Sequence, residues 1–132
     1  MSTPVLELID VKAAYGRIEV LHGVNLVVPD RSVVAVLGPN GAGKTTVLKA
    51  ATGQLRPTSG CVHIAGKHVN GVPADALSRA GVCSIPEGRG IFPNLTVQEN
   101  LRMVTFGGVG LRDVEERTYV RFPKLKQRRT QV

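Results

Sequence analysis

The feature that most constrains the fold of this chain is a glycine-rich stretch, GPNGAGKTT, at residues 38–46. The segment before it, VVAVL at residues 33–37, is apolar throughout and rich in β-branched residues, which is typical of a strand buried on both faces of a parallel sheet. The segment after it has helical spacing, with Val47 and Leu48 on one apolar face and Gly53 placed to end the helix. The order of strand, loop and helix predicts an α/β core.

The spacing within the loop has a physical reason, since Gly38 to Thr45 match the pattern GxxxxGK[ST]. Its glycines let the backbone curl with N–H groups facing inward, and the helix N-terminus adds partial positive charge where phosphate oxygens would rest. We expect Lys44 to reach the β and γ phosphates of a nucleotide and Thr46 to reach the α phosphate. The Thr45 hydroxyl is the expected Mg²⁺ ligand. The nucleotide-binding residues predicted in the loop are Gly38, Pro39, Asn40, Gly41, Ala42, Gly43, Lys44, Thr45 and Thr46. The alternative is a glycine-rich turn without a ligand, which the flanking strand and helix argue against.

Two segments before the loop have strand patterns. VLELIDV, residues 5–11, alternates apolar and polar residues in its first half. IEVLHGVNLVV, residues 18–28, follows after a turn at Tyr15-Gly16. We expect these segments to pair antiparallel at the edge of the domain.

Short elements follow the first helix. A strand pair is expected over residues 61–69 and a short helix over residues 73–81. VCSI, residues 82–85, has the pattern of another buried strand, and a second loop, PEGRGIFPNL, opens directly after it.

The last third of the chain has helical patterns. Thr96 and Glu99 have capping-box spacing ahead of apolar positions, so a helix is expected to begin near Val97. A GGVG stretch is expected to end it. Residues 111–121 look helical again, with Asp113 as the candidate N-cap, until a Phe-Pro pair ends the pattern.

Composition excludes several classes of function. The formal net charge of +7 is concentrated late, since seven of the seventeen Lys and Arg residues lie within residues 112–129, interleaved with acidic residues as in a solvated helix. Aromatic residues are only 4% of the chain, too few for base-stacking platforms, so no nucleic-acid partner is expected. The histidines and the two cysteines, Cys61 and Cys83, lack helical metal-ligand spacing and are expected to be structural or surface residues. With no membrane-spanning apolar run and no basic segment before an apolar one at the start, a cytoplasmic protein is expected.

The loop and its surroundings together resemble a known family. LGPNGAGKTT, preceded by AAYGRIEVLHGVNLVV and followed by PTSGCVHIAGKHV and IPEGRGIFPNLTVQENL, is similar to the ATP-binding subunits of ABC transporters. The resemblance covers essentially the whole chain. The Pro-Glu-Gly-Arg loop followed by Phe-Pro most resembles the branch that serves branched-chain amino-acid importers.

The resemblance implies roles for residues outside the glycine-rich loop. Tyr15 takes the place of the aromatic residue that stacks on adenine, a flat grip on the base, although a strand-end aromatic that covers an edge is an alternative. Glu87 stands where most of the family has a glutamine that touches Mg²⁺ and the attacking water, and a carboxylate can still hold a metal or its water. A solvated loop carboxylate is the alternative for Glu87. Arg89 and Phe92 are expected to face the coupling segment of the transporter, or else to be surface residues.

The family also implies elements that this sequence does not contain. These are an LSGGQ-like signature, an apolar strand ending in aspartate and then glutamate, a short loop after it, and a switch histidine. We therefore expect a truncated ABC ATP-binding domain. Residues 1–95 would hold the antiparallel β subdomain and the P-loop part of the core, and residues 96–132 the start of the helical subdomain. Turnover by this chain alone is expected to be absent, because loss of a general base typically costs about 10²- to 10⁴-fold in rate.

Truncation has a consequence for folding as well. In complete ATPases of this type, two strands lie in the sheet between the strands expected at residues 33–37 and 82–85. Without them, both segments would have open apolar edges, which is an aggregation hazard. The alternative is that the two segments pair with one another.

The function implied by the resemblance is ATP binding, with hydrolysis in the complete domain, to power ABC-type import, most specifically of branched-chain amino acids. ATP and Mg²⁺ are the implied cofactors. Transmembrane permease subunits and a second ATP-binding subunit, in a homo- or heterodimer, are the implied partners, and they would hold the protein at the inner face of the plasma membrane. Two alternatives stay open: a non-catalytic nucleotide-binding module, and another P-loop enzyme such as a nucleotide kinase, against which the second loop argues.

Overall fold

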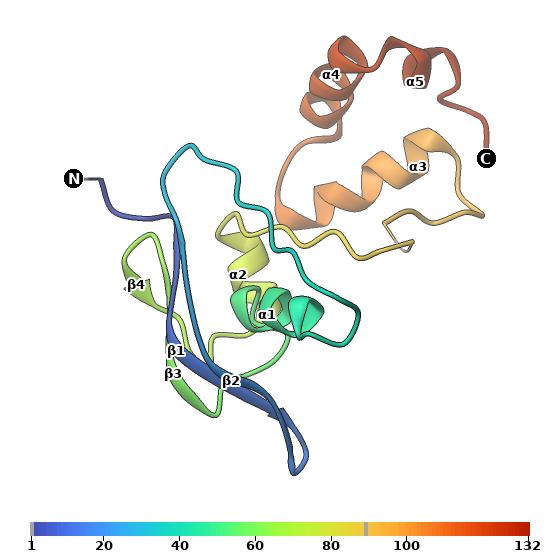
Figure 1. Cartoon of the computed structure of the whole chain (residues 1–132). Coiled ribbons are helices and arrows are strands. Elements are labelled where there is room, and N and C mark those ends of the chain that lie inside the picture. Colours follow the sequence, from blue (N-terminus) through green and yellow to red (C-terminus); the bar gives the residue numbers. More distant parts are fainter. Residues whose placement is uncertain (1, 89) are drawn as a thin grey trace. The chain divides into compact units, whose positions relative to one another are not determined.

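A computed structural model describes residues 2–88 and 90–132 of the chain. The chain divides into two compact units, Met1–Cys83 and Ser84–Val132. Each unit is described by itself below (Figure 1).

The first unit is built on a four-stranded antiparallel sheet. Its strands are β1 (Leu6–Tyr15), β2 (Ile18–Val28), β3 (Ser59–Ile64) and β4 (Lys67–His68). They lie in the order β2-β1-β3-β4 (Figure 1). Strand β1 therefore lies between β2 and β3 and pairs antiparallel with both. The antiparallel pairing of the first two strands and the short strand pair that follows α1 were both expected from the sequence, and the structure confirms them.

A bulge in β1 explains why its alternation stops half-way. Leu8 faces the core, but the next buried positions are Val11 and Ala13, so the inward face shifts by one residue. Asp10 takes a left-handed φ of 46° at this point, and its N–H donates to the Asn25 side-chain oxygen at 2.9 Å. The extra residue of a bulge re-aims the strand in this way.

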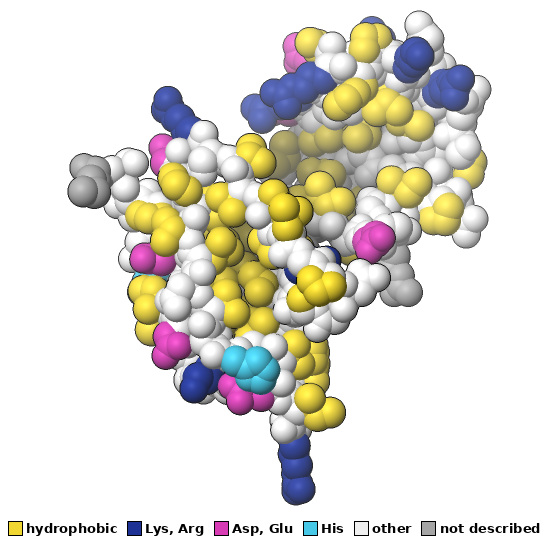
Figure 2. All heavy atoms as spheres, viewed as in Figure 1, with side chains coloured by type: hydrophobic (Ala, Val, Ile, Leu, Met, Phe, Trp, Pro, Cys, Tyr) yellow, Lys and Arg dark blue, Asp and Glu magenta, His cyan; other side chains and the backbone are white. Residues whose placement is uncertain are grey.

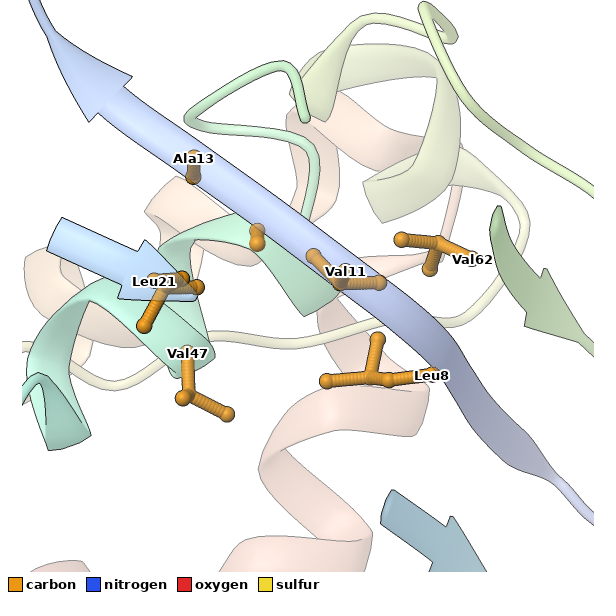
Figure 3. Packing of buried hydrophobic residues seen from close by; sticks show 7 residues of the cluster. Leu8, Val11, Ala13, Leu21, Val47 and Val62 are labelled. Atoms are coloured by element: carbon orange, nitrogen blue, oxygen red, sulfur yellow. The ribbon is translucent and has the colours of Figure 1, made fainter. Parts of the chain in front are cut away.

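The core lies between the sheet and the helix α1 (Lys44–Ala51). Figure 3 shows the apolar side chains of the strands and of α1 pointing toward one another. The buried members of this cluster, 7% exposed or less, are Leu8, Val11, Ala13, Leu21, Val47, Ala50 and Val62. Leu48, expected on the buried face of the helix, is 56% exposed instead, and Val47 and Ala50 are the residues of α1 that belong to the core cluster.

The helix α1 ends as the sequence indicated. Gly53 follows the C-cap Thr52 with a left-handed φ of 78°, and the N–H groups of Gln54 and Leu55 donate back to the Lys49 carbonyl. A glycine at this position closes helices without a Cβ penalty. A second helix, α2 (Ala74–Arg79), follows the β3–β4 hairpin where a short helix was expected.

The two buried parallel strands expected at residues 33–37 and 82–85 are not formed. Neither segment belongs to a β-ladder in the part of the chain that the structure describes. Val33 is 98% exposed, Leu37 89% and Ile85 83%. A central strand needs neighbours on both edges to take up its N–H and C=O groups, and no described segment supplies them here.

These segments leave apolar surface in view. Figure 2 shows hydrophobic side chains exposed on the visible face of the first unit. The aggregation hazard inferred from the sequence therefore stays a prediction, now for exposed apolar coil rather than for open strand edges.

The second unit is helical. It contains α3 (Val97–Arg102), the 3₁₀ helix η1 (Met103–Gly107), α4 (Leu111–Arg121) and α5 (Pro123–Gln127). Gln98 on α3 donates to the Glu115 carboxylate on α4 at 2.7 Å, and the N–H of Val97 donates to the Gln131 carbonyl at 3.0 Å. The end of the described chain thus returns to the start of α3.

Capping decides where these helices begin and end. The expected capping box is present, since the Thr96 hydroxyl accepts from the Glu99 N–H and the Glu99 carboxylate accepts from the Thr96 N–H. Gly108, with φ 95°, ends η1 within the expected GGVG stretch. Asp113 is not the N-cap of α4: that position is Gly110, and Asp113 lies in the first helical turn, where a carboxylate is favoured by the helix dipole.

Candidate functional site

The glycine-rich loop leads directly into α1, as the sequence predicted. Gly43 is the N-cap residue of the helix, with φ 95° and ψ 8°, and Gly41 also has a positive φ of 84°. Both conformations are strained for residues with a Cβ. The Ala42 N–H donates to the Pro39 carbonyl at 3.2 Å, which closes a tight turn inside the loop.

Strand β2 supports the second half of the loop. A Cβ built on Gly43 would lie 3.1 Å from Cδ2 of Leu21 and 3.7 Å from the Val20 carbonyl oxygen. Leu21 is itself buried in the core, only 2% exposed. The start of α1 therefore lies so close to β2 that a side chain at position 43 would crowd Leu21.

The loop encloses a hollow of about 200 Å³ at the start of α1. It is lined by Val20, Asn40, Gly41, Gly43, Lys44, Thr45 and Thr46. Its size is below the roughly 300 Å³ at which pockets for whole drug-sized ligands begin, so it fits part of a ligand such as a phosphate tail. Lys44 gives this lining a formal positive charge, and no lining residue is acidic.

Backbone donors converge on the same hollow. Lys44, Thr45 and Thr46 occupy the first turn of α1, where N–H groups have no acceptor within the helix. The N-cap is glycine and contributes no side-chain acceptor. These three amides and the positive end of the helix dipole therefore face the hollow as an anion-binding site.

The side chains of the first turn have different surroundings. The Lys44 ammonium donates to the Gly38 carbonyl and so folds back over the loop. Thr46 is buried, 6% exposed, whereas the Thr45 side chain lies on the exposed side of the helix start. A hydroxyl at the rim with free access to water can share a hydrated cation with a bound phosphate.

Tyr15 lies at the end of β1 and does not line the hollow. Tyr15 is 45% exposed, and the Lys49 ammonium of α1 lies 5.8 Å from the centroid of its ring. This is within the range of a cation–π contact. The ring is thus tied to the same helix whose first turn forms the hollow, with enough exposed surface left to meet a planar group.

The remaining residues implied by the resemblance belong to the second unit. Glu87 lies in an exposed turn, and its pairing with Thr45 around one metal ion stays a prediction because the two residues belong to different units. Phe92 is 52% exposed, and Asn100 bridges its backbone, accepting from the Phe92 N–H at 2.8 Å and donating to the Phe92 carbonyl. Arg89 lies outside the described residues.

Sequence reasoning missed one contributor to this site. Val20 lines the hollow from β2, although it lies eighteen positions before Gly38, where the loop begins. Its only sequence signal is membership of a strand, because the contact depends on how α1 packs on the sheet. Cys61, which is partly buried, and Cys83, which is exposed, are free thiols.

The lining of the hollow supplies donor groups that can bind an anion. Its lining provides amides, one ammonium and two hydroxyls, but neither a carboxylate nor an imidazole that could act as a general base. No helix of the described residues is long and apolar enough to cross a membrane.

Comparison with known proteins gives this arrangement its context. A family model described as "ABC transporter" matches residues 21–132. The high-affinity branched-chain amino acid transport ATP-binding protein BraF of Pseudomonas aeruginosa is 39% identical over 101 residues, which are 76% of this chain and 40% of that protein. LivG of Escherichia coli K12, a protein of the same description, is 36% identical over 101 residues with the same coverage. A ribose import ATP-binding protein, RbsA 2 of Escherichia coli O157:H7, is 43% identical over 102 residues but only 20% of it is covered.

Solved structures agree with these relatives. A structure described as the ATP-binding subunit of an ABC transporter superposes with a TM-score of 0.79 at 30% identity, covering 96% of this chain and 53% of that one. A nucleotide-free ATP-binding cassette from an ABC transporter superposes with a TM-score of 0.78 at 23% identity, which concerns the fold alone. The expected fold class, the α/β core of a P-loop NTPase with an antiparallel β subdomain and the start of a helical one, is confirmed. The chain spans about two fifths of the branched-chain relatives and about half of the solved subunit.

Proposed function

The chain belongs to the ABC transporter family, and on that premise we propose that it binds Mg²⁺-ATP through residues 38–46. The observation that carries the proposal is a hollow lined by Lys44, Thr45 and Thr46, the first turn of a glycine-capped helix. Phosphate oxygens replace the Gly38 carbonyl as the acceptor for the Lys44 ammonium when nucleotide binds. Family membership also argues against the nucleotide-kinase alternative.

Each part of the nucleotide has a proposed contact. The loop residues Gly38 to Thr46 bind the phosphate tail, chiefly through backbone N–H groups, which all of them except Pro39 have, and Thr46 orients the α phosphate. The Thr45 hydroxyl shares Mg²⁺ with the β and γ phosphates, which suits an ion that takes a few protein oxygens and keeps water. Glu87 is proposed to hold the same ion or one of its waters, and Tyr15 to stack on adenine with its exposed ring face.

The role of the whole protein is proposed from its relatives. Two of them are described as branched-chain amino acid transport ATP-binding proteins, and we propose the same class of import here. The partners are then transmembrane permease subunits and a second ATP-binding subunit. They place the protein on the cytoplasmic side, peripheral to the membrane. Residues 1–95 form the β subdomain and P-loop part of the domain, and residues 96–132 begin its helical subdomain.

Binding and turnover separate in this chain. ATP hydrolysis needs groups that aim water at the γ phosphate and stabilise its charge, and the lining of the hollow has none that can act as a base. We propose that the chain alone binds nucleotide without hydrolysing it. The alternative function, a non-catalytic nucleotide-binding module from a truncated cassette, rests on the same lining.

Calorimetric titration with Mg²⁺-ATP tests the binding step. The untagged 132-residue chain is compared with Lys44→Ala and with Lys12→Ala, which removes the same charge from an exposed site on β1. We expect Lys44→Ala to abolish measurable binding and Lys12→Ala to leave it unchanged. Equal affinities of Lys44→Ala and the unaltered chain, or no binding by any of the three, would contradict the proposal.

A phosphate-release assay distinguishes the two functions. No release above the Lys44→Ala background is expected of the chain alone. Phosphate release that appears when the downstream part of a related cassette is added supports the ATPase. ATP binding without phosphate release under that condition supports the non-catalytic module.

A further inference from the structure

Two histidines face each other across the β3–β4 hairpin. His63 on β3 pairs directly with His68 on β4, and their ring centroids lie 5.5 Å apart with the ring planes at 65°. The turn between them contains Ala65 and Gly66, both with positive φ, which sets this register. Four residues of chain therefore separate two imidazoles that the hairpin brings side by side.

A carboxylate extends this pair across the sheet. Glu7 on β1 is the antiparallel partner of His63, so Glu7, His63 and His68 form a row over three neighbouring strands. Directly opposed residues in such pairs have Cβ atoms about 5 Å apart. Leu8 and Val62, the next residues along, are buried in the core, which puts the row on the opposite face of the sheet.

One nitrogen of this row is left without a partner. Nδ1 of His63 is buried and accepts or donates no hydrogen bond among the described residues. A buried polar atom of this kind calls for an explanation, and an ion is one of the usual ones. Neutral imidazole is also the commonest protein ligand of transition metals.

The spacing of the two rings fits a shared ion. With zinc–nitrogen bonds of about 2.0–2.1 Å, two imidazoles on one tetrahedral ion have ring centroids about 5 Å apart. The observed separation of 5.5 Å is close to this value. His68 is exposed, so its ring can turn a nitrogen toward the ion at little cost.

We propose that His63 and His68 bind one divalent transition-metal ion, zinc in the first instance, with the Glu7 carboxylate as third ligand and water as fourth. In residues 2–88 and 90–132 no three such side chains already surround one point, so Glu7 rotates toward the pair as the ion binds. Imidazole and carboxylate together select Zn²⁺, Cu²⁺ or Ni²⁺ over Mg²⁺. The site is independent of nucleotide binding, because none of its residues lines the hollow beside α1.

Titration of the untagged chain with ZnCl₂, without nucleotide and in a buffer that does not chelate, tests the site. One zinc ion per chain is expected. His68→Gln and His63→Gln should each weaken binding by about tenfold or more, and Glu7→Gln by less, since it removes one of three protein ligands. His22→Gln is the matched control, because His22 is an exposed histidine next to a glutamate, 3.7 Å from Glu19, but has no second imidazole in that ion pair.

Two further measurements keep the outcome unambiguous. Far-UV circular dichroism of each variant checks that the sheet is retained. We expect His68→Gln to disturb the sheet least, because His68 lies in the two-residue strand β4. The visible spectrum of the Co²⁺ complex identifies the ligands, since a thiolate would add a charge-transfer band from Cys61, which lies two residues before His63 on the same strand. Wild-type affinity in folded His68→Gln, a thiolate band that disappears in Cys61→Ser, or the absence of any zinc binding would each overturn the proposal.

Discussion

Replacing the loop glycines by alanine, one at a time, separates the two reasons why a glycine can be needed. Gly38 has no positive φ, and a Cβ there would lie 3.4 Å from the Ala42 Cβ, an ordinary contact. Gly41 has φ 84° but open space around the missing Cβ. Gly43 has φ 95° and would also press its Cβ to 3.1 Å from the Leu21 side chain. Alanine at Gly38 therefore meets neither backbone strain nor crowding. Alanine at Gly41 meets backbone strain alone, and alanine at Gly43 meets both.

The magnitudes follow from these contacts. Alanine at Gly38 stiffens the unfolded chain and is expected to be neutral or stabilising by up to about 1 kcal/mol. At Gly41 a left-handed conformation costs about 1–2 kcal/mol, which the same gain in the unfolded state reduces to about 1 kcal/mol. At Gly43 a further 1 kcal/mol or more, about 2 kcal/mol in total, comes from overpacking, because Leu21 is 2% exposed and cannot simply move aside.

Urea unfolding followed by far-UV circular dichroism measures this series, since the chain has no tryptophan to report by fluorescence. The expected order of the free energy of unfolding is Gly38→Ala at or above wild type, then Gly41→Ala, then Gly43→Ala. Calorimetry with Mg²⁺-ATP should follow, with the largest loss of affinity for Gly43→Ala because it displaces the first turn of α1. If Gly43→Ala proves no less stable than Gly41→Ala, the contact with Leu21 does not constrain the loop and the reasoning fails.

Further predictions concern the sheet, the capping box of α3 and the contact of Tyr15 with the adenine of ATP. Gly60→Ala should prevent the sheet from forming, at a cost on the order of 3 kcal/mol or more, because its Cβ would lie 2.2 Å from the Asp10 carbonyl oxygen; a native-like dichroism spectrum and urea midpoint for this variant would refute it. Hydrogen bonds from the backbone and side chain of Thr96 hold the pKa of Glu99 below its usual range, so their stabilisation of α3 is present above the ordinary glutamate pKa and is lost as the pH falls through the lowered one. Helicity measured against pH should show this loss and Glu99→Gln should abolish the dependence; an unchanged acid transition in that variant would count against it. Tyr15→Ala should weaken ATP binding by about 1–3 kcal/mol, and Tyr15→Phe should not, if the ring stacks on the base; equal affinity of both variants would exclude the stack.

The local elements could be predicted from the sequence because short-range rules determine them. The hairpin of β1 and β2 follows from alternation and a turn, and the start of α3 from a Ser/Thr-x-x-Glu spacing. The prediction of buried strands at residues 33–37 and 82–85 was wrong, because such strands depend on long-range pairing rather than on short-range rules. Their composition suits a strand with neighbours on both sides, and the described residues place no neighbour beside them.

Residues of the sites were predictable to different degrees. The loop pattern locates Lys44 and its neighbours without any tertiary information, because one continuous stretch supplies them. Val20 and the pairing of His63 with His68 required the structure, since both depend on which strands lie side by side. Helical ligand spacing does not detect this pair, because a hairpin with a two-residue turn makes positions five apart direct neighbours.

The missing strand before the loop has a consequence for how nucleotide binds. The helix end of the loop is anchored, because Gly43 lies against β2 and Val47 packs in the core. Residues 38–40 are exposed, and the contacts that hold them are the turn from Pro39 to Ala42 and the bond from Lys44 to Gly38. Phosphates have to take over the Lys44 bond when they bind, so the part of the cradle without support from the sheet must be ordered by the ligand itself. Binding energy spent on that ordering does not appear as affinity, and a parallel strand paired at residues 33–37 would therefore tighten ATP binding without touching the nucleotide.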